Sequence, residues 1–342
     1  MEFKSVRKYA RLRPAPGFHP ETQEIEYRYD PLLGSTTIIN ARRAERARQA
    51  ETTTALSDKI TRETKEGCPF CPEQIEEKAP LFPEEISPEG RFRQGECIVF
   101  PNLFAFAEYH AVGTFSRTHF LYLDQFSTEM LVNNMTASQK WMLSVRAVDE
   151  NVVYPVYMWN HLPPSGGSII HPHCQIMMRQ MPTSMQARLI SRSSGYFKEK
   201  DRNYWQELIR REKEIGERFI AEYDSLAIIA SYAPRGFREI QFIFREVSTF
   251  TDLDEAQLNE FAEAILKVLL GYRKMGVGSF NIITFSGPAG KRLEYYCLNA
   301  KIISRPFPQG VYTSDTGTLE RLQDEWVIET LPEDVASRMR SF

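Results

Sequence analysis

Two histidines two residues apart, His171 and His173, follow a Gly-Gly-Ser turn and precede an apolar run. Residues at i and i+2 of a β-strand point to the same face, so a strand here would direct both imidazoles into one cavity. Gly166 and Gly167 allow the backbone to approach a ligand closely and to present N–H groups to an anion. Because an isolated His-x-His is common in structural roles, the flanking residues must carry the interpretation. Together they favour a reaction at phosphorus, with one histidine as nucleophile and the other as an anchor.

Residues 160–175 begin with an asparagine and end in His-Pro-His-Cys-Gln. This segment resembles, without a gap, the active-site signature of the galactose-1-phosphate uridylyltransferase family, the nucleotidyl-transferring branch of the histidine-triad superfamily. In the hydrolases of that superfamily, a third histidine stands where Gln175 stands here. The resemblance therefore implies a transferase in which His173 and Gln175 are catalytic. The residues that it places on the α-phosphate and the ribose region are Asn160, Gly166, Gly167 and Ser168.

A second part of the resemblance lies near the N-terminus. An Arg-x-x-Pro-Leu-x-Gly turn at residues 28–34 precedes the strand-like residues 35–40 and then a cluster of arginines. An arginine cluster taken alone is more often a solvated basic surface. In the family, paired arginines at this place reach the phosphates of the nucleotide, and Arg43 and Arg46 are the matching positions. Guanidinium groups suit phosphate oxygens because they bond in a bidentate manner.

Cys68 and Cys71 form a Cys-x-x-Cys turn that contains proline. This spacing provides half of a tetrahedral zinc site. The alternative is a redox pair, which would need a thioredoxin-like strand and helix around it, whereas residues 72–95 are rich in proline and glutamate. The sequence therefore favours a metal, with the missing ligands to come from His or Cys elsewhere.

The family completes this site with a histidine ahead of the triad and the first histidine of the triad, here His119 and His171. The resemblance implies one structural zinc on Cys68, Cys71, His119 and His171, since four protein ligands leave no open position for water. Cys97 and Cys174 are alternative ligands, although buried free thiols are the simpler interpretation. Some family members hold a second metal with C-terminal histidines, but no histidine follows His173, so one metal is expected. Whether the ion is zinc or iron stays open.

Two polar residues of the first half have less specific interpretations. Asn102 follows the strand-like residues 97–101 and matches an asparagine of the family that contacts the nucleotide. Asparagine is common in turns in any case, so this match is weaker evidence than the histidine motif. His110 falls where the family often has a histidine that is not the nucleophile, and we expect a structural role for it.

The composition excludes several classes of protein. The chain has 342 residues, a net charge of −3 and 42% hydrophobic residues. This charge argues against a general nucleic-acid binder, which would normally be basic. No apolar run approaches the roughly 18 residues of a membrane span, and residues 1–8 lack the apolar core of a signal peptide. Five cysteines, of which only two are close, do not form a disulfide framework, so the cytoplasm is the expected compartment.

The order of expected elements predicts an α+β fold built from two histidine-triad-like modules. Strands, a helix and two further strands from residue 97 to 179 recur from residue 226 to 303. We interpret this as a degenerate duplication, with helices packed on a mostly antiparallel sheet. The modules span residues 1–195, with the catalytic and zinc sites, and 196–342. In the second module Asn299-Ala300-Lys301 replaces the His-Pro-His, so it is expected to be non-catalytic. Each module alone would expose a sheet edge, so both should share one sheet.

Other segments have simpler expectations. Residues 1–24 are expected to form an extended arm and residues 47–66 a polar linker. A capping-box pattern at residues 136–139 predicts a helix to about residue 150, and a charged amphipathic segment predicts one long helix over residues 199–223. The C-terminal tail lacks the Lys, Tyr-Glu and Gln pattern with which the family reads its sugar phosphate. This difference and the Pro163-Pro164 pair put the galactose substrate in doubt.

The resemblance also implies a mechanism. His173 attacks the α-phosphorus of a nucleotide sugar, a covalent nucleotidyl-histidine forms, and a sugar phosphate or phosphate then accepts the nucleotide, which predicts ping-pong kinetics. Gln175 would hold the intermediate, and Arg43 and Arg46 would offset charge on the phosphates. No Gly-x-x-x-x-Gly-Lys phosphate loop is present. The expected partners are small phosphorylated molecules, with neither nucleic acid nor membrane, and the family implies a homodimer.

Three alternatives stay open. The same triad serves in ADP-glucose phosphorylase and in diadenosine-polyphosphate phosphorylase, so the base and the acceptor can differ from those of galactose metabolism. A histidine-triad hydrolase is disfavoured by Gln175. A non-catalytic zinc protein that binds nucleotides is disfavoured by the retention of both His173 and Gln175.

Overall fold

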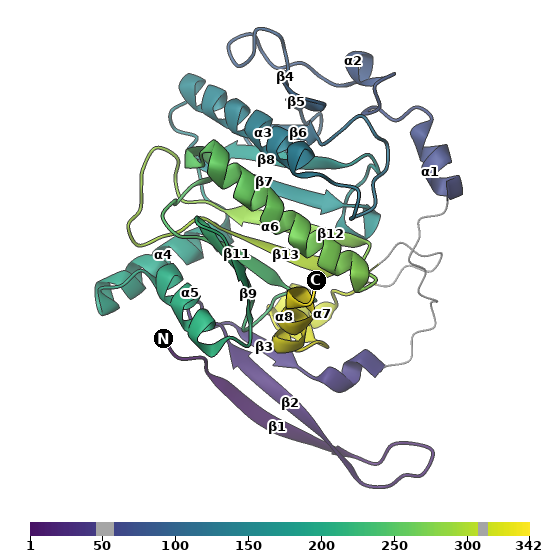
Figure 1. Cartoon of the computed structure of the whole chain (residues 1–342), viewed down its shortest axis with the longest axis vertical. Helices are drawn as coiled ribbons and strands as arrows, with labels where there is room; N and C mark the ends of the chain where they lie inside the picture. The colour runs from purple at the N-terminus through teal and green to yellow at the C-terminus, as the bar shows by residue number, and fades with distance from the viewer. Residues whose placement is uncertain (46–57, 307–313) are drawn as a thin grey trace.

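The computed structural model describes residues 1–45, 58–306 and 314–342, and its strands form two sheets (Figure 1). The larger sheet has ten strands in the order β4-β5-β6-β8-β7-β12-β13-β11-β10-β9, and all of its strand pairs are antiparallel. Its strands are β4 (Phe92–Gln94), β5 (Cys97–Pro101), β6 (Tyr109–Thr114), β7 (Tyr154–His161), β8 (His173–Arg179), β9 (Phe219–Glu222), β10 (Leu226–Ala230), β11 (Ile240–Phe244), β12 (Ser279–Phe285) and β13 (Asn299–Arg305).

Two long helices, α3 (Thr128–Val148) and α6 (Glu255–Lys274), lie side by side across one face of this sheet (Figure 1). Successive side chains along a strand point to opposite faces of the sheet, so the residues that pack against α3 and α6 all lie on one face. Cys174, Ile176 and Met178 of β8 are buried in the same core as the helices, so His173 and Gln175 point to the opposite face. The expected α+β fold with helices on a mostly antiparallel sheet is confirmed.

The order of strands shows the expected repetition. β5-β6-β8-β7 of the first half is followed in the sheet by β12-β13-β11-β10 of the second, which is the same arrangement turned about an axis between β7 and β12. At this junction Asn160 pairs with Asn281 and Met158 with Ile283. The two halves therefore share one continuous sheet, and neither exposes an edge where they meet.

Some expected helices have different bounds in the structure. α3 begins at Ser127, whose side chain accepts a hydrogen bond from the backbone N–H of Met130, so the start predicted at residue 136 is wrong. The single helix predicted over residues 199–223 is also wrong. α4 (Ser184–Lys200) ends at Asp201 in a left-handed conformation, α5 (Tyr204–Ile215) begins after the cap Asn203, and residues 219–222 are strand β9.

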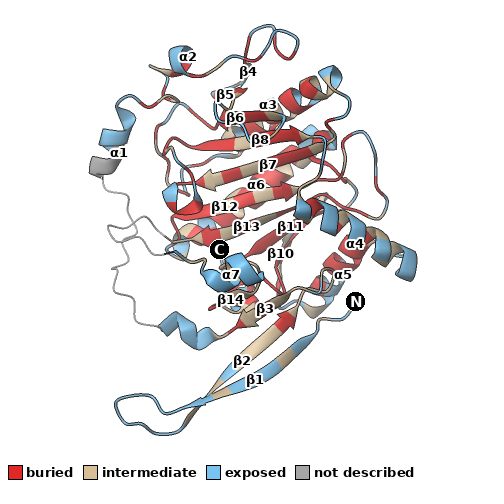
Figure 2. Cartoon of the chain, turned by 180° about the vertical axis from the view of Figure 1, so that it is seen from behind, coloured by how far each residue is buried: buried red, intermediate tan, exposed pale blue. Residues whose placement is uncertain are grey.

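The N-terminal segment is a hairpin rather than an arm. β1 (Ser5–Leu12) and β2 (Glu21–Tyr29) pair in the smaller sheet, whose order is β1-β2-β3-β14. Figure 2 shows that β1 is mostly exposed and β2 mostly of intermediate burial. The expected linker contains helix α1 over residues 58–65.

None of the described helices has the length and apolar character needed to cross a membrane. The remaining elements are β3 (Thr36–Ile39), β14 (Trp326–Ile328), α1 (Asp58–Lys65), α2 (Ile75–Lys78), α7 (Thr318–Gln323), α8 (Pro332–Arg340) and the 3-10 helices η1 (Ala41–Glu45), η2 (Pro163–Ser165) and η3 (Phe250–Asp252).

A buried network of charges fastens the smaller sheet to the second module. Arg28 of β2 and Arg218 both donate to Oε1 of Glu333 on α8, at 2.8 and 2.9 Å. The Nε of Arg218 also donates to Glu212 of α5 at 3.0 Å, and both guanidinium groups lie 4.9 Å from the ring centre of Tyr232. Removing one partner would leave an uncompensated buried charge, which is strongly destabilising.

Glu212 makes this network sensitive to pH. Its side chain is fully buried, and burial raises its pKa from 4.5 to about 7 despite the ion pair with Arg218. A carboxyl whose pKa is higher in the folded state stabilises the fold in its protonated form. We therefore expect the free energy of unfolding to fall, by an amount on the order of 2 kcal/mol, as the pH rises from 4.5 to about 7.

The measurement is urea denaturation of wild type and Glu212→Gln at several pH values. The stability of the variant relative to wild type should increase with pH, because the glutamine cannot acquire a charge. Glu214→Gln, an exposed change on the same helix, is the matched control and should leave the pH profile unchanged. Parallel profiles for wild type and Glu212→Gln would contradict the prediction.

Candidate functional site

Four side chains from three separate parts of the sequence meet at one end of β8. Ligand atoms of Cys68, Cys71, His119 and His171 all lie within 4.8 Å of one another, and all four residues are buried. The Sγ of Cys71 lies 3.4 Å from Nδ1 of His119 and 3.6 Å from Nδ1 of His171. The four predicted metal ligands are thus brought together.

The distances in this cluster fit a tetrahedral metal. Zinc binds sulfur at about 2.3 Å and nitrogen at about 2.0 Å, so tetrahedral angles separate these two ligand atoms by about 3.5 Å. Without an ion, burial and the neighbouring Cys68 raise the pKa of the Cys71 thiol to about 12. A divalent cation reverses that preference because the thiolate is the ligand. The donor set of two thiols and two imidazoles suits zinc.

Hydrogen bonds orient both histidines of the cluster. The carbonyl oxygen of Ser116 can only accept, so Nε2 of His171, at 2.9 Å, carries the proton and donates. The hydroxyl of Thr64 in α1 donates to the carbonyl oxygen of Thr61 at 3.3 Å, so its oxygen can accept from Nε2 of His119, which lies 3.1 Å away. In both rings Nδ1 is then free to bind the ion, and the partner on the other nitrogen holds the ring in place, as is usual for metal-bound histidines.

His173 is the first residue of β8, two residues after a ligand of the cluster. Its Nδ1 lies 2.8 Å from the carbonyl oxygen of His171, so this nitrogen carries the proton and donates. Burial lowers the pKa of His173, which keeps the ring neutral at pH 7. The ring also has an edge contact with Phe70 of the Cys-x-x-Cys turn, with centroids 5.2 Å apart. The remaining nitrogen, Nε2, therefore holds a lone pair and can act as a nucleophile.

Gln175 follows on the same face and belongs to a polar cluster with His110 and Asn102. The backbone N–H of Phe106 donates to Nδ1 of His110 at 3.4 Å, so Nε2 of His110 carries the proton and donates to Oε1 of Gln175 at 3.0 Å. Burial lowers the pKa of His110, which is consistent with a neutral ring. Nδ2 of Asn102 lies 3.2 Å from the same Nε2, but in this tautomer both nitrogens are donors, so the contact is not a hydrogen bond. This arrangement leaves the amide NH₂ of Gln175 free to donate to a ligand.

The loop that contains Gly166 and Gly167 packs tightly against the junction of the two modules. A side chain at Gly167 would place its Cβ 2.8 Å from the carbonyl oxygen of Asn160, and Gly166 has a φ of +90°. These positions therefore require glycine. Asn281 of β12 donates to Oδ1 of Asn160 at 2.6 Å and to the carbonyl oxygen of Ser165 at 2.7 Å. The second module thus holds the loop of the first.

Of the two predicted phosphate-binding arginines, the structure describes only Arg43, and it does not join Arg43 to this loop. Arg43 is exposed in η1, which follows β3 of the smaller sheet. Among the described residues, no hydrogen bond or ion pair links its side chain to His173 or to residues 160–168. Arg46 lies outside the described residues.

Sequence reasoning missed several residues of the site. Asn281 was overlooked because it belongs to the module expected to be non-catalytic, and only strand pairing brings it to Asn160. Ser116 and Thr64 act through the ligand histidines, and no motif identifies them. Phe70 could have been predicted from the sequence, because it lies between the two cysteines.

His161 is the last residue of β7, and burial lowers its pKa to about 3, so its ring is neutral.

Known proteins are similar to this chain in sequence and in fold. No family model matches the chain. An uncharacterized protein of Archaeoglobus fulgidus is 31% identical over 345 residues, which cover 99% of this chain and 98% of that protein. The chain belongs to the same family as this archaeal protein.

Solved structures then decide the fold. An ADP-glucose phosphorylase from Arabidopsis thaliana with bound ADP-glucose superposes with a TM-score of 0.73 at 19% identity, covering 93% of this chain and 99% of that one. A galT-like protein from the same plant gives 0.71 at 18% identity, covering 92% and 98%, and a uridylyltransferase gives 0.68 at 16%, covering 92% and 97%. The chain has the uridylyltransferase fold. The resemblance inferred from residues 160–175 is confirmed at the level of the fold. In this chain His173, the second histidine of the His-Pro-His-x-Gln segment, is the first residue of β8.

Proposed function

We propose that the protein is a nucleotidyltransferase that works through a covalent nucleotidyl-histidine on His173. The observation that carries the proposal is the hydrogen bond from Nδ1 of His173 to the carbonyl oxygen of His171, which leaves Nε2 unprotonated in a neutral ring. An imidazole held in this tautomer needs no further base before it attacks an electrophile. The amide of Gln175 on the same face supports a phosphorus centre beside it, because its free NH₂ can donate to phosphoryl oxygens.

The proposed reaction has two displacements. Nε2 of His173 forms a bond to the α-phosphorus of a nucleotide sugar, the bond from that phosphorus to the bridging oxygen breaks, and the sugar phosphate leaves with the electron pair. An oxygen of the acceptor, a sugar phosphate or inorganic phosphate, then attacks the same phosphorus and releases Nε2. The loop at Gly166, Gly167 and Ser168, with Asn160, would hold the nucleotide, and the roles of Arg43 and Arg46 in offsetting phosphate charge stay predictions from the family resemblance.

The metal has a structural part in this proposal. Zinc bound by Cys68, Cys71, His119 and His171 would have no open position for a substrate. It would fix the backbone at His171, and this residue's carbonyl oxygen in turn sets the tautomer of His173. The metal therefore positions the nucleophile without touching the reacting atoms.

The test is intact-mass spectrometry of the purified protein after incubation with UDP-glucose, ADP-glucose or a diadenosine polyphosphate. A mass gain of one nucleoside monophosphate, absent from His173→Asn, is the expected result and identifies the base. ADP-glucose comes first because one structural neighbour binds it. Consumption of donor with no adduct and no requirement for an acceptor would support a hydrolase instead. Untouched donors would support a binding protein.

A further prediction concerns His110 as a positioning residue for Gln175. In His110→Ala the amide of Gln175 is free to turn, so kcat should fall about tenfold while KM changes little, since the lost interaction strengthens with charge on the phosphoryl group. Steady-state kinetics of a double-mutant cycle measures this. Because both residues act through one hydrogen bond, His110→Ala should have almost no effect in a Gln175→Ala background. Additive losses would contradict the prediction.

A further inference from the structure

A series of hydrogen bonds joins the C-terminal tail to the loop of the proposed active site. The Nε of Arg305 on β13 donates to one carboxylate oxygen of Asp315 at 2.9 Å, and its Nη2 lies 2.8 Å from the other. The remaining nitrogen, Nη1, donates to Oδ1 of Asn281 on β12 at 3.0 Å. Asn281 in turn donates to Asn160 and to the carbonyl oxygen of Ser165. One planar guanidinium thus connects the tail to the amide that supports the loop.

The side chains of this series lie on the same face of the large sheet as His173. Phe280 of β12 and Ile302 of β13 pack in the core under α3 and α6. Asn281 and Arg305 are an odd number of residues away from them along the same strands, so both point to the opposite face. The second module therefore directs a charged group toward the active-site face from a strand that carries no predicted site residue.

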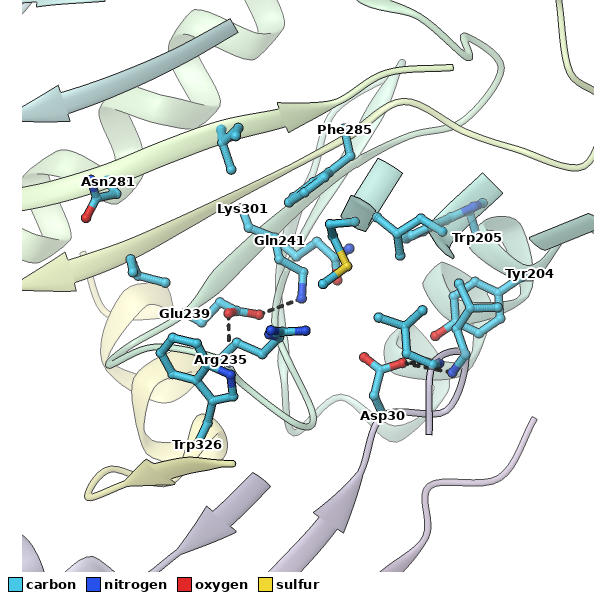
Figure 3. A pocket seen from close by; sticks show the side chains of 16 residues that line it. Asp30, Tyr204, Trp205, Arg235, Glu239, Gln241, Asn281, Phe285, Lys301 and Trp326 are labelled. Atoms are coloured by element: carbon cyan, nitrogen blue, oxygen red, sulfur yellow. Dashed lines mark hydrogen bonds and ion pairs between the residues drawn. The ribbon is translucent and has the colours of Figure 1, made fainter. Parts of the chain in front are cut away.

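Asn281 also lines a cavity of about 270 Å³ in the second module. Figure 3 shows it at one side of the lining, apart from the charged groups of Asp30, Glu239 and Lys301. Lys301 donates to Glu239 at 2.7 Å, so these two groups satisfy each other. Within the part of the chain that the structure describes, Arg305 is the one charged residue that bonds to the amide of Asn281.

Arg305 fixes which end of the Asn281 amide faces the loop. A guanidinium can only donate, so the atom of Asn281 that it contacts is the oxygen Oδ1. The NH₂ group of Asn281 then faces Asn160 and donates to its Oδ1 at 2.6 Å. The NH₂ group of Asn160 forms no hydrogen bond with any described residue, so it is free to donate to a ligand. The direction of the first hydrogen bond therefore decides that Asn160 presents a donor.

We propose that Arg305 and Asp315 are positioning residues that orient the amide of Asn160 to donate to the oxygens of a bound nucleotide. Asp315 holds the guanidinium through two nitrogens, and only 8% and 16% of the Asp315 and Arg305 side chains are exposed, so the fork has little freedom to turn. Neither residue touches the reacting atoms. The kinetic consequence rests on the proposed nucleotidyl transfer, whereas the orientation of the two amides does not.

The first measurement records the side-chain NH₂ resonances of protein labelled with ¹⁵N-asparagine, assigned with Asn281→Asp and Asn160→Asp. Arg305→Met should shift the signals of both amides, although Asn160 does not contact Arg305. Arg245→Met, the same chemical change at an ion pair with Glu222 of the edge strand β9, is the matched control and should shift neither. An unchanged Asn160 signal in Arg305→Met would overturn the proposal.

The second measurement is steady-state kinetics with UDP-glucose or ADP-glucose, whichever gives the mass adduct on wild type. Arg305→Met should raise KM about tenfold with kcat nearly unchanged, because Asn160 would hold the nucleotide equally in the ground state and the transition state. Arg305→Lys should raise KM as much, because an ammonium cannot replace the fork between Asp315 and Asn281. In an Asn281→Ala background, Arg305→Met should have almost no further effect.

Arg305→Met leaves the carboxylate of Asp315 without its partner, which can destabilise the fold. Arg305→Met combined with Asp315→Asn removes both charges and should show the same increase in KM. A wild-type KM in this double variant or in Arg305→Lys, or additive effects of Arg305→Met and Asn281→Ala, would overturn the proposal. If neither donor forms an adduct on wild type, the proposed transferase is refuted instead, and the asparagine resonances still decide the role of Arg305.

Discussion

Replacing His173 by asparagine is expected to abolish the nucleotidyl adduct and to lower kcat about 10⁴-fold or more, because loss of a covalent nucleophile removes the whole reaction path. Asparagine is smaller than histidine, but its amide nitrogen takes the place of Nδ1 and can still donate to the carbonyl oxygen of His171. The fold and the metal should therefore be retained. The measurement combines intact mass with single-turnover rates on the donor identified for wild type.

Two controls make this result specific. His19→Asn, at an exposed position in the loop that joins β1 and β2, should behave like wild type. The metal content of His173→Asn should equal that of wild type, because His173 is not in the ligand cluster. Equal rates of adduct formation in His173→Asn and wild type would show that another side chain is the nucleophile.

Replacing Cys71 by serine is expected to remove the metal and to destabilise the first module by several kcal/mol. Both imidazoles of the cluster face this sulfur, so its loss opens the tetrahedron, and the binding free energy of a structural zinc is also folding free energy. We expect a metal content near zero, measured by elemental analysis, and a lower melting temperature. Wild type treated with a strong chelator should reach the same lowered melting temperature.

Cys297→Ser provides the matched control, since Cys297 is a buried free thiol of the second module. It should keep one metal ion per chain. Full metal occupancy in Cys71→Ser would contradict the ligand set.

Much of the fold followed from local patterns. The order predicted from residue 226 to 303, strands, a helix and two further strands, is observed as β10, β11, α6, β12 and β13, because short apolar runs and apolar residues at helical spacing are local signals. The helix bounds that were predicted wrongly also came from reading local signals. The capping pattern at residues 136–139 lies inside α3, where packing on the sheet extends the helix past it. The break between α4 and α5 depends on the backbone conformation at Asp201 and on the Asn203 cap, which helical periodicity does not reveal.

The sequence by itself determined which groups the site offers: an imidazole and an amide two residues apart on one strand face, and a Cys-x-x-Cys pair suited to zinc. These depend on spacing within single segments, which the period of a strand or a turn converts directly into geometry. Only the tertiary structure decided which atoms are free to act. The tautomer of His173, the orientation of Gln175 by His110 and the support of Asn160 by Asn281 depend on hydrogen bonds between strands. Such contacts arise from strand order and register across the sheet, which no short stretch of sequence encodes.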